Sequence, residues 1–155
     1  MEPLTRQQIA RKQDWMDRYL RARRREALTA RTLEEARSAA ARVSPVLDGM
    51  PRPSGHSDRV PPSAERLAEA EHAHNIALAE MRQARGEVQQ AVGSVRDRTG
   101  REVLYRRYLL GQPLLQVSQE MMLEYRWVRR LHRRAGQRRD APAVRAGHRP
   151  PASFT

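Results

Sequence analysis

The chain has 155 residues, a length that fits one domain or one domain with an extension. Its 30 lysine and arginine residues outnumber 18 acidic residues, and the net charge is +12. Such a charge favours polyanionic partners, with nucleic acid first and an anionic membrane surface second. The absence of cysteine excludes disulfides, thiolate zinc sites and a cysteine nucleophile.

Two further exclusions concern membranes and export. No segment approaches the roughly 18 apolar residues that a membrane span requires, and the first residues, MEPLTRQQIARKQ, lack the apolar core of a signal peptide. We therefore expect a cytosolic protein without a membrane partner. Because only 39% of the residues are apolar and 5% aromatic, the core should be thin, which favours long helices over a compact globule.

The first predicted element is one long amphipathic helix over residues 4–47. This segment contains no glycine, and its first proline is Pro45. Its apolar residues recur at helical spacing, and they are Ile9, Met16, Leu20, Ala27, Ala30, Leu33, Ala40, Val43 and Leu47. Three consecutive arginines, at positions 23–25, interrupt this apolar stripe.

A loop is predicted over residues 48–62, where four prolines and two glycines occur in fifteen positions. Ser63 is expected to cap a second helix that continues to about Arg98. Along that helix a stripe of residues recurs every seven positions: Leu67, His74, Met81, Val88 and Val95. An alanine lies three residues after each of the first four members, and these alanines are Ala70, Ala77, Ala84 and Ala91.

Alanine at the second position of a heptad lets a partner helix approach closely. The alanine-rich first helix is the obvious partner, so residues 1–98 are expected to form a long antiparallel helical hairpin, or coiled coil, of about 50–60 Å. Half-buried interface packing is the expected role of His74, and the same stripe could instead pair two chains in a homo-oligomer. Residues 137–155 lack periodicity and are predicted to be a disordered tail.

Residues 99–136 are predicted to form the DNA-binding domain. The net charge is +5 over residues 1–47, −1 over 63–98 and +7 over 99–139, so an arginine-rich coding bias cannot account for all of the C-terminal charge. The expected order is a helix from Arg101 to Leu110 and a break at Gly111-Gln-Pro113, where glycine is the left-handed cap and proline opens the next helix. A two-turn helix to Met121, a short turn and a basic helix from Tyr125 to Ala135 follow. This order is typical of a helix-turn-helix.

The stretches LYRRYLLGQPLLQVSQEM and YRWVRRLHRRA resemble the C-terminal part of small phage and prophage proteins. These join a helical coiled coil to a helix-turn-helix like sigma-70 region 4, and they include a domain-of-unknown-function family and relatives of the RinA and ArpU late-gene regulators. The loop GMPRPSGHSDRV is similar to the linker of such proteins. Family members usually have glycine where Met122 stands, and a turn that needs positive φ would disfavour methionine.

The resemblance implies roles for the basic helix and places the protein in the cytoplasm of a bacterial host cell. Base contacts are expected from Tyr125, Arg126, Arg129 and Arg130, since the arginine fork can bind guanine O6 and N7. Phosphate contacts are expected from Arg133 and Arg134, and also from Arg106 and Arg107 on the preceding helix. Packing is the favoured role of Trp127. The resemblance leaves open whether RNA polymerase is a partner.

No nucleophile–base pair, glycine-rich phosphate loop or metal-ligand spacing is present in the sequence, so we expect no enzyme, no metal and no cofactor. Three functions stay open. The first is a sequence-specific regulator of phage or prophage transcription that binds double-stranded DNA. The second is a DNA-recognising assembly factor, such as a small terminase subunit. The third is a basic coiled-coil protein that binds polyanions nonspecifically.

Overall fold

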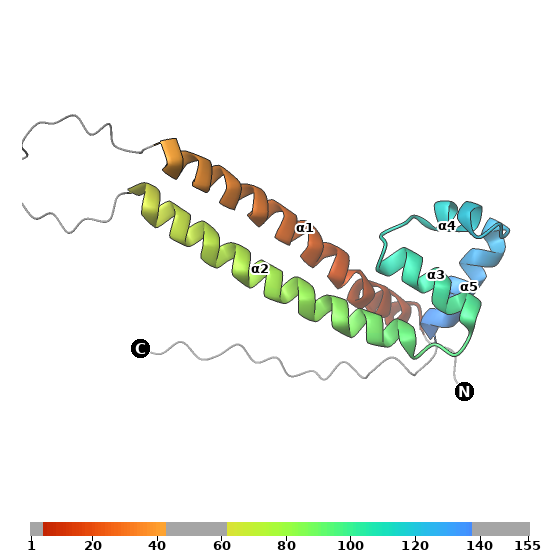
Figure 1. Cartoon of the computed structure of the whole chain (residues 1–155). Coiled ribbons are helices and arrows are strands. Elements are labelled where there is room, and N and C mark those ends of the chain that lie inside the picture. Colours follow the sequence, from red (N-terminus) through yellow and green to blue (C-terminus); the bar gives the residue numbers. More distant parts are fainter. Residues whose placement is uncertain (1–4, 43–61, 138–155) are drawn as a thin grey trace, which may run out of the picture. The chain divides into compact units, whose positions relative to one another are not determined.

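The computed structural model describes residues 5–42 and 62–137, and these residues contain five helices and no strand (Figure 1). The helices are α1 (Arg6–Arg42), α2 (Pro62–Gly93), α3 (Arg98–Tyr108), α4 (Leu114–Glu120) and α5 (Tyr125–Gln137). The predicted all-α class is therefore confirmed. The predicted loop and tail lie outside the described residues, except for Pro62 and Gln137, which belong to α2 and α5.

The chain divides into two compact units. One unit consists of residues 16–86, and the other combines residues 1–15 with residues 87–155. Among the described residues, no helix combines the length and the apolar character that a membrane crossing requires.

Within residues 16–86, α1 and α2 lie side by side in opposite directions (Figure 1). Three side-chain contacts join them: Arg25 to Glu80 at 3.0 Å, Thr29 to His74 at 3.4 Å, and Arg37 to Glu71 at 3.9 Å. As the residue number rises along α1 from 25 to 37, the number of its partner on α2 falls from 80 to 71. The two helices are therefore antiparallel. Both ion pairs lie at the surface, where such pairs stabilise little, so apolar packing holds this pair of helices.

The apolar packing follows the predicted heptad closely on α2. Ala70, Ala77 and Ala84 are buried. Of the larger side chains of the stripe, Leu67, His74 and Met81 are half-buried and Val88 is completely buried. Small buried side chains alternate with larger half-buried ones, as expected where a second helix approaches closely. The half-buried state predicted for His74 is confirmed, and its Nδ1 faces the Thr29 hydroxyl.

The stripe predicted for α1 is correct in part. Leu20 and Leu33 are buried as predicted. Ala27, which was predicted to be buried, is exposed, and Tyr19, which was not predicted, is buried. The reason is the period of the buried face. Tyr19, Glu26 and Leu33 are seven residues apart, and Ala27 lies one residue beyond that line, so its side chain points about 100° away. The predicted members Val43 and Leu47 lie outside the described residues.

Several predicted boundaries differ from the structure. The ends of α3, α4 and α5 differ by one or two residues, and larger differences occur in α2 and at the start of α3. Helix α2 begins at Pro62, so Ser63 is its second residue and not its cap. It ends at Gly93, whose missing side chain makes helix continuation costly, although Val95 beyond it is still buried as the stripe predicted. Helix α3 begins at Arg98, three residues before the predicted start, because Asp97 provides the extended N-cap and its carbonyl accepts a hydrogen bond from the Arg101 N–H at 2.8 Å.

The three C-terminal helices pack around a small core (Figure 1). Val103 of α3, Val117 of α4, and Val128 and Leu131 of α5 are buried together. Partly buried residues that pack against this core are Leu114, Met121 and Leu123. Every residue predicted to face inward in this segment does so; these are Val103, Leu104, Tyr108, Leu109, Val117, Met121, Val128, Leu131 and Ala135.

The break between α3 and α4 is built by Gly111. Its φ of 76° is left-handed, a conformation that glycine adopts without a steric penalty, and the prediction of a left-handed cap is confirmed. Pro113 is the N-cap of α4 rather than its first residue, with φ −66° and ψ 147°. Since proline has no N–H to satisfy, it suits a helix start.

The turn between α4 and α5 spans residues 121–124. The Leu123 N–H donates to the Ser118 carbonyl at 2.9 Å and the Met122 N–H to the Gln119 carbonyl at 3.2 Å. This is the hydrogen-bond pattern of a Schellman cap, which places Met122 at the left-handed position, with φ 52°. Met122, where members of the resembled family usually have glycine, therefore occupies a position that requires positive φ.

Candidate nucleic-acid interface

Helix α5 has one face anchored in the core and the other exposed. Val128 is completely buried, and Leu131 and Ala135 are 3% and 8% exposed. These three positions are spaced by three and four residues, so they form one helical stripe. All five arginines of the helix are exposed, and they are Arg126, Arg129, Arg130, Arg133 and Arg134.

Within the described part of the chain, the exposed arginines of α5 have no acidic partner. Among the described residues, no carboxylate pairs with any of them, whereas arginines elsewhere do form such pairs. The first turn of the helix contains no acidic residue either. This surface therefore presents five positive charges that the described part of the protein leaves unneutralised.

Two of these arginines stack on aromatic rings of the same helix. The guanidinium carbon of Arg129 lies 5.8 Å from the centroid of the Tyr125 ring, and that of Arg130 lies 5.1 Å from the Trp127 ring. The spacings of four and three residues bring these side chains to the same side of the helix. Stacking of this kind restricts the guanidinium without using its hydrogen-bond donors, so both groups stay able to donate to an incoming partner.

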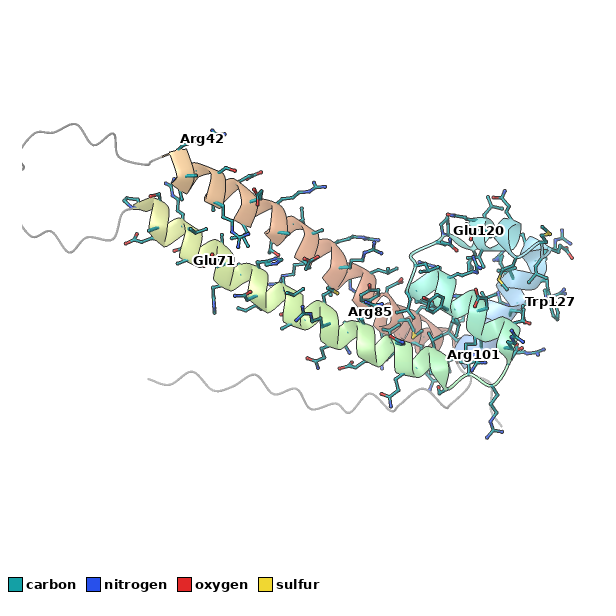
Figure 2. The ribbon with its side chains drawn as sticks, in the orientation of Figure 1. Arg42, Glu71, Arg85, Arg101, Glu120 and Trp127 are labelled. Atoms are coloured by element: carbon teal, nitrogen blue, oxygen red, sulfur yellow. The ribbon has the colours of Figure 1, made fainter. Side chains whose placement is uncertain are left out.

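Trp127, labelled in Figure 2, is 39% exposed and carries the Arg130 stack on its ring. Packing over the edge of the core was its predicted role, and the contact described for its ring is the one with Arg130. Tyr125, at the first position of α5, is 41% exposed. Arg133 and Arg134 lie further along the helix and are exposed without ring contacts among those described.

Arg106 of α3 occupies a different environment from the arginines of α5. Its Nε donates to Glu102 of the same helix at 2.7 Å, and its Nη1 donates to Glu120 of α4. The guanidinium therefore joins α3 to α4 in this structure. The predicted phosphate contact of Arg106 stays a prediction, and it would require this side chain to leave or share two carboxylates.

Glu120 is the centre of this polar cluster (Figure 2). Its carboxylate accepts from Gln116 Nε2 at 2.8 Å and from Gln112 Nε2 at 3.0 and 3.1 Å, as well as from Arg106. Hydrogen bonds from Gln116 and Gln112, together with the charge of Arg106, hold the pKa of this carboxyl below its ordinary value of 4.5. The cluster fixes α4 and the Gly111 loop against α3.

A second polar contact joins α3 to α5. The Tyr108 hydroxyl lies 2.9 Å from His132 Nε2, and the two rings are stacked with centroids 5.6 Å apart. Arg107, the other α3 arginine predicted to contact phosphate, has its guanidinium carbon 5.3 Å from the Tyr108 ring. Because His132 lies between Arg129 and Arg133 in the sequence, this contact helps to fix how α5 presents its arginines.

The spacing of apolar residues predicts the buried face of α5, but neither polar contact between the helices was predicted. The Glu102–Arg106 pair, four residues apart on one helix, was detectable from spacing. The partners Glu120 and His132 lie 14 and 24 residues from Arg106 and Tyr108. No local pattern signals such a pairing before the helices are packed.

The part of the chain that the structure describes contains no group of three or more histidine and acidic side chains that could hold a metal ion. No protein-family model, no curated protein and no solved structure matches the chain. The features of the molecule that bear on its function are therefore the geometry and charge of α3–α5.

Proposed function

We propose that helices α3–α5, residues 98–137, form a helix-turn-helix that binds double-stranded DNA, with α5 as the helix that enters the major groove. We call these residues the C-terminal unit. A seven-residue helix, a turn over residues 121–124 and a 13-residue basic helix match the order of that motif. Helix α3 supports both of the other helices, through the valine core and through the polar contacts of Arg106 and Tyr108.

The observation that carries the proposal is the unneutralised arginine face on an anchored helix. Arg126 and Arg130, Arg129 and Arg133, and Arg130 and Arg134 are like-charged pairs four residues apart. Each such pair destabilises a helix by about 0.2–0.5 kcal/mol. The burial of Val128 and Leu131 maintains the helix despite that repulsion. A polyanion would remove the repulsion, which makes DNA phosphate a fitting partner for this face.

Within α5 the proposal assigns two tasks. Arg126 and Arg129 lie in the first turns, where a recognition helix meets base edges, and the guanidinium fork matches guanine O6 and N7. Tyr125 supports Arg129 by the ring stack described above. Arg133 and Arg134, one to two turns later, are assigned to phosphate.

We further propose that the protein regulates phage or prophage transcription. The resemblance of residues 104–121 and 125–135 to helix-turn-helix regulators supports this role. The antiparallel α1–α2 pair is proposed to be a coiled-coil hairpin that can also pair with a second copy. We propose no catalytic activity, and the contact with RNA polymerase is left to experiment.

The test is selection of bound fragments from random duplex DNA by the full chain. We expect enrichment of one short motif that contains guanine, and a palindromic motif if two copies bind. The matched control is the R126A/R129A chain, which should enrich no motif while still binding DNA. Equal retention of all sequences by the unmodified chain would contradict the proposal and favour nonspecific polyanion binding. Ring-shaped assemblies on the DNA would favour a terminase-like assembly factor.

A further inference from the structure

Helix α1 carries a second concentration of arginine, separate from α5. Residues 18–31 contain six arginines and a single acidic residue, Glu26, whereas residues 63–98 of the chain have a net charge of −1. This concentration lies in the unit formed by residues 16–86. Neither the proposed recognition helix nor the packing of α1 against α2 accounts for it.

Three of these arginines share one face of α1 that points away from α2. Arg21, Arg24 and Arg31 are exposed, and Leu28 between them is 63% exposed. Their spacings of three, four and three residues place all four on one side of the helix. The opposite side contains Leu33, which is buried. We call these four residues the α1 basic face, and it extends about 15 Å along the helix.

Two of the three charges of this face are available to a partner. No described carboxylate pairs with Arg24 or Arg31. Arg25, one residue from the face, is in contrast paired with Glu80 across the helix interface. The protein thus neutralises an arginine at the interface, whereas Arg24 and Arg31 on the outer face have no acidic partner among the described residues.

We infer that the α1 basic face binds the phosphate backbone of duplex DNA, independently of base sequence. This inference extends the proposed function and takes its partner from it. Arg24 and Arg31 are two helical turns apart, about 10.5 Å, so they can meet different phosphates, each in the bidentate geometry that guanidinium and phosphate share. A membrane surface is the less suitable partner, because an interfacial helix needs an apolar face and Leu28 is the only large apolar residue here.

The test compares charge-matched variants of the full chain on a random-sequence duplex. The R24A/R31A chain loses two charges from the face, and the R82A/R85A chain loses two exposed charges from α2. Figure 2 labels Arg85 on that helix. Because each lost phosphate contact lowers the slope of log K against log salt by about 0.9, R24A/R31A should lose about two units of slope. R82A/R85A should lose much less, and R24K/R31K should keep the slope of the unmodified chain.

Two results would overturn the inference: equal slopes for R24A/R31A and R82A/R85A, or loss of binding to phosphatidylserine vesicles by R24A/R31A with its DNA slope unchanged. Binding of the R126A/R129A chain to a selected site, measured in parallel, distinguishes failure of the α1 inference from failure of the proposed function. If that chain loses its preference for the site while R24A/R31A behaves like its control, the recognition helix stands and only the α1 basic face is rejected.

Discussion

The antiparallel helices of residues 16–86 and the three helices of residues 98–137 bury apolar faces in different ways. The first region repeats one small contact along its length, with Ala70, Ala77 and Ala84 buried at seven-residue intervals. The second concentrates its core in three valines and Leu131 and adds polar contacts between helices. A repeated contact should tolerate the loss of one member, whereas a concentrated core should not. The two regions also differ in how they hold exposed arginines: the concentrated core anchors the arginine face of α5, whereas the α1 basic face lies on a helix held by the repeated contact.

The largest expected effect follows from deletion in the concentrated core. L131A should destabilise the C-terminal unit by about 2–5 kcal/mol, because the cavity would open beside Val103, Val117 and Val128. Chemical denaturation with amide hydrogen exchange would assign the loss to residues 98–137. The comparison would be contradicted if residues 16–86 lost as much protection as residues 98–137.

The contact between the alanines of α2 and helix α1 should instead be sensitive to a side chain that is too large. A77L should destabilise the α1–α2 pair by about 1–3 kcal/mol, since the alanine is 1% exposed and a larger side chain would force the helices apart. A27L is the matched control, because Ala27 is exposed, and it should change stability by less than about 0.5 kcal/mol. Thermal unfolding followed by circular dichroism would measure both. Equal effects of the two variants would show that Ala77 does not face α1.

A smaller effect is expected at the turn before the basic helix. M122G should stabilise the protein by about 1 kcal/mol, since the left-handed conformation costs most residues roughly 1–2 kcal/mol and glycine offsets part of the gain by its freedom in the unfolded chain. Met122 is 93% exposed, so the change removes little packing. M122A keeps the Cβ atom and should bring no such gain. A less stable M122G would contradict the φ of 52°.

The smallest effect concerns the polar cluster and depends on pH. The pKa of Glu120 is lowered in the folded protein, so its contribution to stability is present above the ordinary value of 4.5 and is lost as the pH falls through the folded pKa. E120Q should remove this part of the acid sensitivity. The unfolding midpoints of both chains, followed from pH 6 to pH 3, should converge at the acid end. Parallel curves would show that Glu120 does not contribute.

Part of the fold is determined locally by the sequence and was predictable from residue spacing. Heptad spacing predicted the buried alanines of α2, and helical spacing predicted the buried face of α5, because both features are set by neighbours three to seven residues away. The error at Ala27 came from the same method: beside an interrupted stripe, a shift of one residue was enough to choose the wrong face.

The candidate site was predictable in its charges and not in their surroundings. The exposed arginines of α5 follow from the spacing of Val128 and Leu131. The environment of Arg106 does not, because its partner Glu120 comes from another helix, and only the packed structure distinguishes this held arginine from the unpaired arginines of α5. Sequence patterns locate charge, whereas tertiary packing decides which charges remain available.

We propose that arginines in the first turns of α5 contact bases and that its later arginines contact phosphate. The most direct test measures DNA binding by single alanine variants of Arg126, Arg129, Arg133 and Arg134 on a selected site and on random duplex, across a salt series. R126A and R129A should each cost about 1–3 kcal/mol on the selected site and much less on random duplex. R133A and R134A should weaken both equally and reduce the salt slope by about one unit each. Equal losses by all four variants on both DNAs would contradict the account, since α5 would then be a basic surface without sequence preference.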